Sequence, residues 1–150
     1  MMKKLILVLP VVLAAAIASA TASSAEPSPV RTIEGYGLAA CPASSFCLYQ
    51  DADFNGSRNA SIWVITETIW NLNDYGINDV ASSAYLNEPS DGPWATLYAE
   101  PHGRDRRTGD YVKLYPGKSL KDFHDVGGYD KNDKPKRVWL NDAISSVMIG

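Results

Sequence analysis

Residues 78–83 read Asn-Asp-Val-Ala-Ser-Ser, and residues 141–146 read Asn-Asp-Ala-Ile-Ser-Ser. A strand-like apolar run follows each copy, at residues 84–86 and 147–149. A polar phrase that recurs at the start of a strand indicates two copies of one supersecondary unit. Its Asn and Asp side chains, Ser hydroxyls and turn carbonyls are oxygen donors, the ligand type that Ca²⁺ takes. Two plain turns are the alternative, because Asn-Asp often opens a turn and Ser caps its own backbone.

The first 25 residues have the pattern of a secretory signal peptide. A basic start at residues 1–4 precedes an apolar run at residues 5–18, and small residues follow as far as Ala25. The apolar run is too short to span a bilayer comfortably, and no later apolar stretch is longer. We therefore predict a secreted, extracellular protein with no membrane span in its mature chain.

The charge of the chain argues against nucleic acid as a partner. The whole chain has a net charge of −3, and removing residues 1–25 takes away Lys3 and Lys4 but no acid, which leaves −5. A protein that binds nucleic acid needs a dense basic face instead. Residues 26–150 suffice for one modest hydrophobic core, and we expect a monomer.

Cys41 and Cys47 are the two cysteines of the chain. In an oxidising compartment they are expected to form one local disulfide. Closing so short a loop removes little entropy from the unfolded chain, so the bond would mainly fix local geometry. A zinc site that adds His102 and His124 is the alternative, although the spacing fits no zinc-finger pattern.

The rest of the chain predicts short strands and no long helix. Residues 26–39 are expected to be a flexible lead-in, and ordered structure is expected to begin near Cys41. A Pro-rich linker then separates repeat 1, about residues 40–88, from repeat 2, about residues 94–150. Short strands broken by Gly, Asn, Asp and Pro predict an all-β sandwich or barrel, and two such halves suit a pair of Greek keys.

The stretch Tyr49–Gly56 resembles the folded hairpin of βγ-crystallin domains. In that family an aromatic residue opens the turn, a second aromatic packs back on it, and a glycine supplies backbone freedom. The two Asn-Asp-x-x-Ser-Ser phrases resemble the calcium-binding motif of microbial members of the superfamily. Together the resemblances cover roughly residues 40–150 and imply two Greek keys in a βγ-crystallin-like β-sandwich that binds two Ca²⁺ ions.

The resemblance also implies the ligands of each ion, because one motif would face the hairpin of the other repeat. The first set consists of the Asp79 side chain, the Val80 carbonyl, the Ser82 hydroxyl and the Glu100 region. The second set consists of Asp142, Ala143, Ser145 and the Asp51 region. The outer residues of each motif would hold the loop shape: Asn78, Ser83, Asn141 and Ser146. Each ion would clip the two halves together, with an affinity on the order of 10⁻⁴ to 10⁻⁶ M.

A second resemblance concerns Cys-Pro-x-x-x-Phe-Cys-Leu-Tyr at residues 41–49. This stretch is similar to small secreted bacterial metalloproteinase inhibitors of the crystallin fold (peptidase inhibitor family I36). Those inhibitors carry a second disulfide that braces the protease-binding loop, and this chain has no cysteines for it. The alternative function is therefore inhibition of secreted metalloproteases. The basic insertion at residues 131–137 is a candidate recognition loop, or else a solvated, mobile excursion.

Catalysis has little support in the sequence. His102 and His124 are the two histidines, and neither belongs to a recognisable nucleophile or metal motif. His124 and Asp125 are adjacent, so on a strand they would point to opposite faces. We therefore predict a secreted, non-enzymatic calcium-binding domain.

Overall fold

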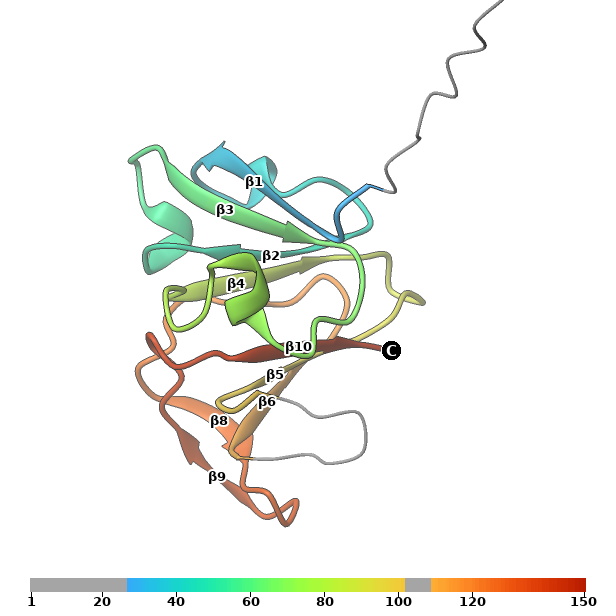
Figure 1. Cartoon of the computed structure of the whole chain (residues 1–150), viewed down its shortest axis with the longest axis vertical. Helices are drawn as coiled ribbons and strands as arrows, with labels where there is room; N and C mark the ends of the chain where they lie inside the picture. The colour runs from blue at the N-terminus through green and yellow to red at the C-terminus, as the bar shows by residue number, and fades with distance from the viewer. Residues whose placement is uncertain (1–26, 102–108) are drawn as a thin grey trace, which may run out of the picture.

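The computed structural model describes residues 27–101 and 109–150. The predicted signal peptide, residues 1–25, lies outside the described residues. Two five-stranded antiparallel sheets stack on each other (Figure 1). Among the described residues, no helix is long and apolar enough to cross a bilayer.

The first sheet has the strand order β1-β3-β2-β4-β7. Its strands are β1 (Val30–Gly35), β2 (Ser45–Tyr49), β3 (Ala60–Ile65), β4 (Ser83–Asn87) and β7 (Ser119–Leu120). The second sheet has the order β10-β5-β6-β8-β9. Its strands are β5 (Ala95–Tyr98), β6 (Tyr111–Leu114), β8 (Val126–Tyr129), β9 (Pro135–Val138) and β10 (Ser146–Ile149). Three short 3₁₀ turns complete the described secondary structure: η1 (Leu38–Ala40), η2 (Asp53–Asn55) and η3 (Leu72–Tyr75).

Each half of the chain contributes a short segment to the sheet of the other half. Strand β7 belongs to the second half but pairs with β4 in the first sheet. In return, Ile69 of the first half forms an antiparallel bridge with Val147 of β10. This exchange is the fourth-strand return of a Greek key, so the predicted pair of Greek keys in a β-sandwich is confirmed.

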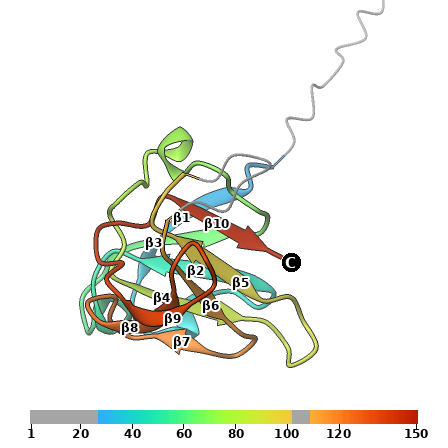
Figure 2. The same ribbon diagram turned by 90° about the horizontal axis from the view of Figure 1, so that it is seen from below.

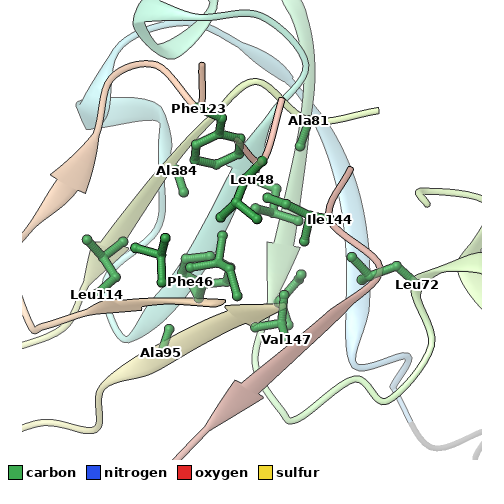
Figure 3. Packing of buried hydrophobic residues seen from close by; sticks show 14 of the residues in the cluster. Phe46, Leu48, Leu72, Ala81, Ala84, Ala95, Leu114, Phe123, Ile144 and Val147 are labelled. Carbon is green, nitrogen blue, oxygen red and sulfur yellow. The ribbon is translucent and has the colours of Figure 1, made fainter. Parts of the chain in front are cut away.

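The hydrophobic core lies between the two sheets. Figure 3 shows Leu48 of β2 beside Phe123 and Ile144, with Phe46 nearer Leu114 and Ala95. Phe46, Leu48, Phe123 and Ile144 are all at most 1% exposed. Strand β2 is buried along its whole length. Phe46 and Leu48 belong to the core between the sheets, and Cys47 and Tyr49 belong to a smaller cluster on the other face of the first sheet. Burying a side chain of this size contributes about 1.5–3 kcal/mol, so the shared core is a main reason for the two halves to stay together.

The prediction that ordered structure begins near Cys41 is wrong. Residues 30–35 form β1, which pairs with β3 along its whole length, from Val30↔Ile65 to Gly35↔Ala60. The two prolines, Pro27 and Pro29, stand before this strand and therefore do not interrupt its hydrogen bonds. The outer edge of β3 is thus covered by the segment that was expected to be a flexible lead-in.

The basic insertion of the second half is an ordered hairpin. Strands β8 and β9 pair from Val126↔Val138 to Tyr129↔Pro135 and extend the second sheet beyond β6. Gly128 is required there, because a Cβ atom would lie 2.5 Å from the Tyr111 carbonyl oxygen. Residues 131–137 are all exposed, as the alternative of a solvated excursion expects, but paired strands hold their flanks. Figures 1 and 2 show this hairpin at the far end of the sheet from β10.

Candidate metal centre

The hairpin after β2 has the folded form that its sequence predicts. The rings of Tyr49 and Phe54 meet edge to face with centroids 5.6 Å apart. Phe54 has φ 56°, and Gly56 follows with φ 56°, so the turn uses the left-handed region. The Asn55 side chain ties this turn together, a role that the sequence analysis missed. Its Oδ1 accepts from the Asp51 N–H, and its Nδ2 donates to the Gly35 carbonyl, both at 2.9 Å.

The two repeated phrases lie against each other with approximate two-fold symmetry. The Asp79 N–H donates to the Ile144 carbonyl at 3.1 Å, and the Asp142 N–H donates to the Ala81 carbonyl at 3.3 Å. These four residues occupy matching positions in the two phrases. Both aspartates have positive φ, 56° for Asp79 and 49° for Asp142, which turns each loop toward its partner.

The last serine of each phrase anchors it to a hairpin of its own half. The Ser83 hydroxyl donates to the Asp51 carbonyl at 2.7 Å, and the Ser146 hydroxyl donates to the Glu100 carbonyl at 2.9 Å. Both serines are completely buried. Because strand pairing places Tyr49 opposite Ser83 and Tyr98 opposite Ser146, each phrase meets the hairpin that continues the strand beside it.

The first residue of each phrase orients the aspartate that follows it. The Asn78 amide donates to Asp79 Oδ2 at 2.5 Å, and the Asn141 amide donates to Asp142 Oδ2 at 2.8 Å. The Oδ1 atoms of both asparagines are buried and accept no hydrogen bond from the described part of the chain. The expectation that Asn78, Asn141, Ser83 and Ser146 hold the loop shape is confirmed by these contacts and by the serine anchors.

A hollow of about 560 Å³ opens at this place. Five of the eight predicted ligand residues line it: Asp51, Asp79, Val80, Ser82 and Asp142. Gln50, Trp63 and Gly76 complete the lining. The structure therefore gathers residues from both phrases and from the first hairpin around one opening.

The expected grouping of the ligands stays a prediction, and the described contacts favour a different one. Val80 and Ser82 line the hollow together with Asp51, which belongs to the hairpin of their own half. The contacts between the halves are made by the aspartate side chains. Asp142 of the second half lines the same hollow as Val80 and Ser82, and Asp79 Oδ1 of the first half accepts a hydrogen bond from the Ser145 hydroxyl at 3.3 Å.

Two regrouped donor sets could hold cations here, with Asp79 at the border between them because it also lines the hollow. The first set is Asp51, Val80, Ser82 and Asp142. The second set is Glu100, Ala143, Ser145 and Asp79. Ala143 is placed in the second set because it lies two residues before Ser145 in the same loop.

The side chain of Asp51 is already engaged. Its carboxylate forms an ion pair with the Arg58 guanidinium, and this hydrogen bond raises the pKa of Arg58. The donor that Asp51 offers a cation is therefore its backbone carbonyl. That oxygen accepts the Ser83 hydroxyl and keeps a second lone pair.

The donor set fits a hard cation. In residues 27–101 and 109–150, no three His, Cys, Asp or Glu side chains gather closely enough to hold a metal ion by themselves. A cation here would depend on carbonyls and hydroxyls together with one carboxylate, and mixed oxygen sets of this kind suit Ca²⁺. The zinc alternative is wrong, because Cys41 and Cys47 form the predicted disulfide and offer no thiolates.

His124 lies in a different cluster. Its Nδ1 is 2.5 Å from Asp122 Oδ1, and its ring meets the exposed Trp139 ring edge to face at 4.8 Å. The hydrogen bond from His124 lowers the pKa of Asp122. Asp125 pairs instead with Arg137. His102 lies outside the described residues.

Several solved structures are similar to this sandwich. One, described as "Evolution of the eye lens beta-gamma-crystallin domain fold", is 22% identical, covers 81% of this chain and 96% of its own, and has a TM-score of 0.55. The fold is that of the βγ-crystallins. A βγ-crystallin from Ciona intestinalis is 21% identical over 71% of this chain and 99% of its own, with a TM-score of 0.45. Spherulin 3A from Physarum polycephalum is 25% identical over 78% of this chain and 93% of its own, with a TM-score of 0.44.

A family model matches part of this βγ-crystallin sandwich. Residues 37–109 match the model of peptidase inhibitor family I36. The match begins before the disulfide and includes the folded hairpin and the first repeated phrase. The βγ-crystallin-like fold and the resemblance of residues 37–109 to family I36 are therefore confirmed. No curated protein matches the chain.

Proposed function

We propose that this protein is a secreted, non-enzymatic calcium-binding domain in which two Ca²⁺ ions clip the Greek-key halves together. The observation that carries the proposal is the reciprocal contact of the two phrases beside a hollow lined by Asp142, Asp51, Val80 and Ser82. Each ion would take a carboxylate from one half and a hydroxyl and carbonyls from the other. Such ligands could not converge in the unfolded chain, so calcium would bind mainly the folded state.

The stabilisation follows from mass action. A free Ca²⁺ concentration about 100 times the dissociation constant stabilises the folded state by about 2.7 kcal/mol per site. For a domain of this size, this amounts to several degrees in melting temperature. Mg²⁺ would stabilise less, because it demands a tighter octahedral set and keeps its water ligands.

The test is a thermal melt of residues 26–150 in chelator, in millimolar Ca²⁺ and in millimolar Mg²⁺. We expect a calcium-specific rise, and we expect Asp79→Ala or Asp142→Ala to remove about half of it because each variant disables one site. Asp91→Ala is the matched control, since it removes an equal charge from the exposed linker. An unchanged melting temperature in Ca²⁺ would contradict the proposal and leave the phrases as structural turns.

Inhibition of a secreted metalloprotease is the second candidate function. The observation that favours it is the match of residues 37–109 to peptidase inhibitor family I36. The chain lacks a second disulfide, so any inhibitory loop must be held by other contacts. Titration of the protein into a panel of secreted metalloproteases tests this function. Nanomolar inhibition during which the protein stays uncut supports this function. Cleavage of the protein as an ordinary substrate contradicts it.

A further inference from the structure

A second hollow lies on the outer face of the sheet at β6, β8 and β9, among residues that the calcium proposal does not use. Its volume is about 300 Å³, at the lower end of the range for small-ligand pockets. The lining residues are Lys113, Tyr115, Gly127, Gly128, Tyr129, Pro135 and Lys136. None of them lines the hollow at the repeated phrases.

The floor of this hollow is backbone. Val112 and Val126 face the core, so their neighbours Lys113 and Gly127 lie on the opposite face of the sheet. A Cβ atom on Gly127 would meet nothing within 4 Å, which shows that the space above this residue is open. A larger residue at position 127 would occupy the hollow.

The walls include tyrosine rings held in place from behind. Tyr129 stacks on Tyr111 with centroids 5.2 Å apart and an interplanar angle of 20°, and Tyr111 contacts Tyr98 at 5.5 Å. The Tyr111 hydroxyl also donates to the Asp133 carboxylate. Tyr115, in contrast, is 59% exposed at the rim. A fixed ring and an exposed ring beside an open floor form a surface on which a flat, partly apolar ring can pack.

The charge at the rim is positive. Lys136 pairs with Asp110 at 2.7 Å, and Arg137 nearby pairs with Asp125. Lys113 has no carboxylate within ion-pair distance in the described ranges 27–101 and 109–150, although it is only partly exposed. An unpaired ammonium group at the edge of a tyrosine-lined hollow favours an anionic ligand.

The acids of the β8–β9 hairpin do not compete for this lysine. The Asp130 carboxylate accepts the backbone N–H groups of Asn132 and Lys134 at 2.8 and 3.0 Å. Asp133 accepts the Tyr111 hydroxyl. Both carboxylates are therefore engaged by hydrogen bonds of their own, and neither forms an ion pair with Lys113 in the described part of the chain.

We propose that this hollow binds a sugar acid, a pyranose ring that carries a carboxylate or sulfate group, as a unit of an acidic polysaccharide. The apolar C–H face of the ring packs on Tyr115 and Tyr129 above the Gly127 backbone. The Lys113 ammonium pairs with the anionic group, while Lys136 stays paired with Asp110 at the rim. Binding at this site needs no calcium, because its contacts lie in a different hollow from the repeated phrases.

The test is calorimetric titration of the whole mature chain in chelator with four probes of equal length. These are an oligogalacturonate, a sulfated glucose oligomer, a neutral glucose oligomer and an oligoglutamate. We expect binding of one or both sugar acids, and no detectable binding of the neutral oligomer or the peptide. The two sugar-acid probes distinguish a carboxylate from a sulfate as the preferred group.

Variants locate the binding in the hollow. Lys113→Gln is expected to weaken binding about tenfold, as loss of a charged hydrogen bond does. Gly127→Val is expected to abolish binding by filling the hollow. Tyr115→Ala is expected to weaken binding by removing one wall, and because the Tyr115 ring is exposed, this change should leave the fold intact. Lys131→Gln is the matched control, because it removes an equal charge from the exposed hairpin turn outside the hollow, and it should change affinity less than about twofold.

Absence of binding by both sugar acids would overturn the proposal, and so would any of three further results. The first is equal weakening by Lys131→Gln and Lys113→Gln, which would indicate general charge attraction. The second is unchanged affinity in both Gly127→Val and Tyr115→Ala. The third is oligoglutamate binding as tight as that of the sugar acids, which would indicate an acidic peptide. Because the titration is done in chelator, its result does not depend on calcium binding. A negative titration therefore does not contradict the calcium proposal, and a negative calcium melt does not contradict this one.

Discussion

At the scale of single residues, Asp51 has two groups that could bind a cation, its side-chain carboxylate and its backbone carbonyl. Its carboxylate is held by Arg58, while its carbonyl lies under Ser83 beside the hollow. We therefore expect Asp51→Asn to keep most of the calcium-dependent rise in melting temperature, because the carbonyl remains. Asp142→Ala should lose about half of that rise, since it removes the carboxylate of one of two sites.

The measurement for Asp51 is the same thermal melt, read as the difference between calcium and chelator for each variant. Arg58→Gln is the control, because it frees the Asp51 carboxylate without removing it. If Asp51→Asn loses as much of the calcium response as Asp142→Ala, the carboxylate of Asp51 and not its carbonyl is the donor.

The sequence predicts most residues of the candidate site but not how they group. Five predicted ligands do line one hollow, because the repeated phrase can be read directly from the chain. The partner of each phrase depends on the register of β4 on β2, which sets Ser83 opposite Tyr49. That register is a long-range property, decided by which strands pair, and no local pattern around residues 78–83 encodes it.

At the scale of elements, the turn of the β8–β9 hairpin depends on ionised carboxylates. Backbone hydrogen bonds from Lys134 and Asn132 lower the pKa of Asp130, and the Arg137 guanidinium lowers the pKa of Asp125. A carboxylate with a lowered folded-state pKa stabilises the fold fully above its unfolded value, about 3.9, and loses that contribution as the pH falls through the folded value. The hairpin should therefore loosen in acid below about pH 4.

Amide exchange across the β8–β9 pairs, followed from pH 6 down to pH 3, measures this loosening. After correction for intrinsic exchange, protection at Gly128 and Lys136 should fall with pH in the natural chain. Asp130→Asn should lower protection already at pH 6 and flatten the profile. A profile in Asp130→Asn that is as steep as that of the natural chain would assign the acid sensitivity to other groups.

Two features that the sequence did not predict, strand β1 and the β8–β9 hairpin, are both additions to an edge of the crystallin sandwich. Strand β1 covers the edge of β3, and β8 extends the sheet beyond β6. Val30 and Ile33 are three residues apart and pack against different clusters, so β1 has no alternating pattern, and the prolines before it are typical of a linker. The Gly127-Gly128 pair likewise indicates a turn, and only the close approach of Gly128 to Tyr111 explains a glycine within a strand.

At the scale of the whole molecule, the exchanged segments make the halves interdependent. Strand β7 pairs with β4, the Ile69–Val147 bridge runs the other way, and the Thr68 side chain bonds both the N–H and the carbonyl of Ile149. A half that unfolded alone would remove pairing partners from both sheets. The sandwich should therefore unfold as one cooperative unit even without calcium.

Two matched core substitutions test this cooperativity, Leu48→Ala in the first half and Ile144→Ala in the second, both at side chains at most 1% exposed. Each should lower stability by about 2–5 kcal/mol, the usual result of a large-to-small change in a packed core. In chelator, each should also shift a single transition without splitting it, with a calorimetric enthalpy equal to the van't Hoff enthalpy. Two separable transitions, with only one displaced by each variant, would instead show that the halves fold independently. The exchanged strands would then be contacts between two finished units, and calcium would be the main connection between them.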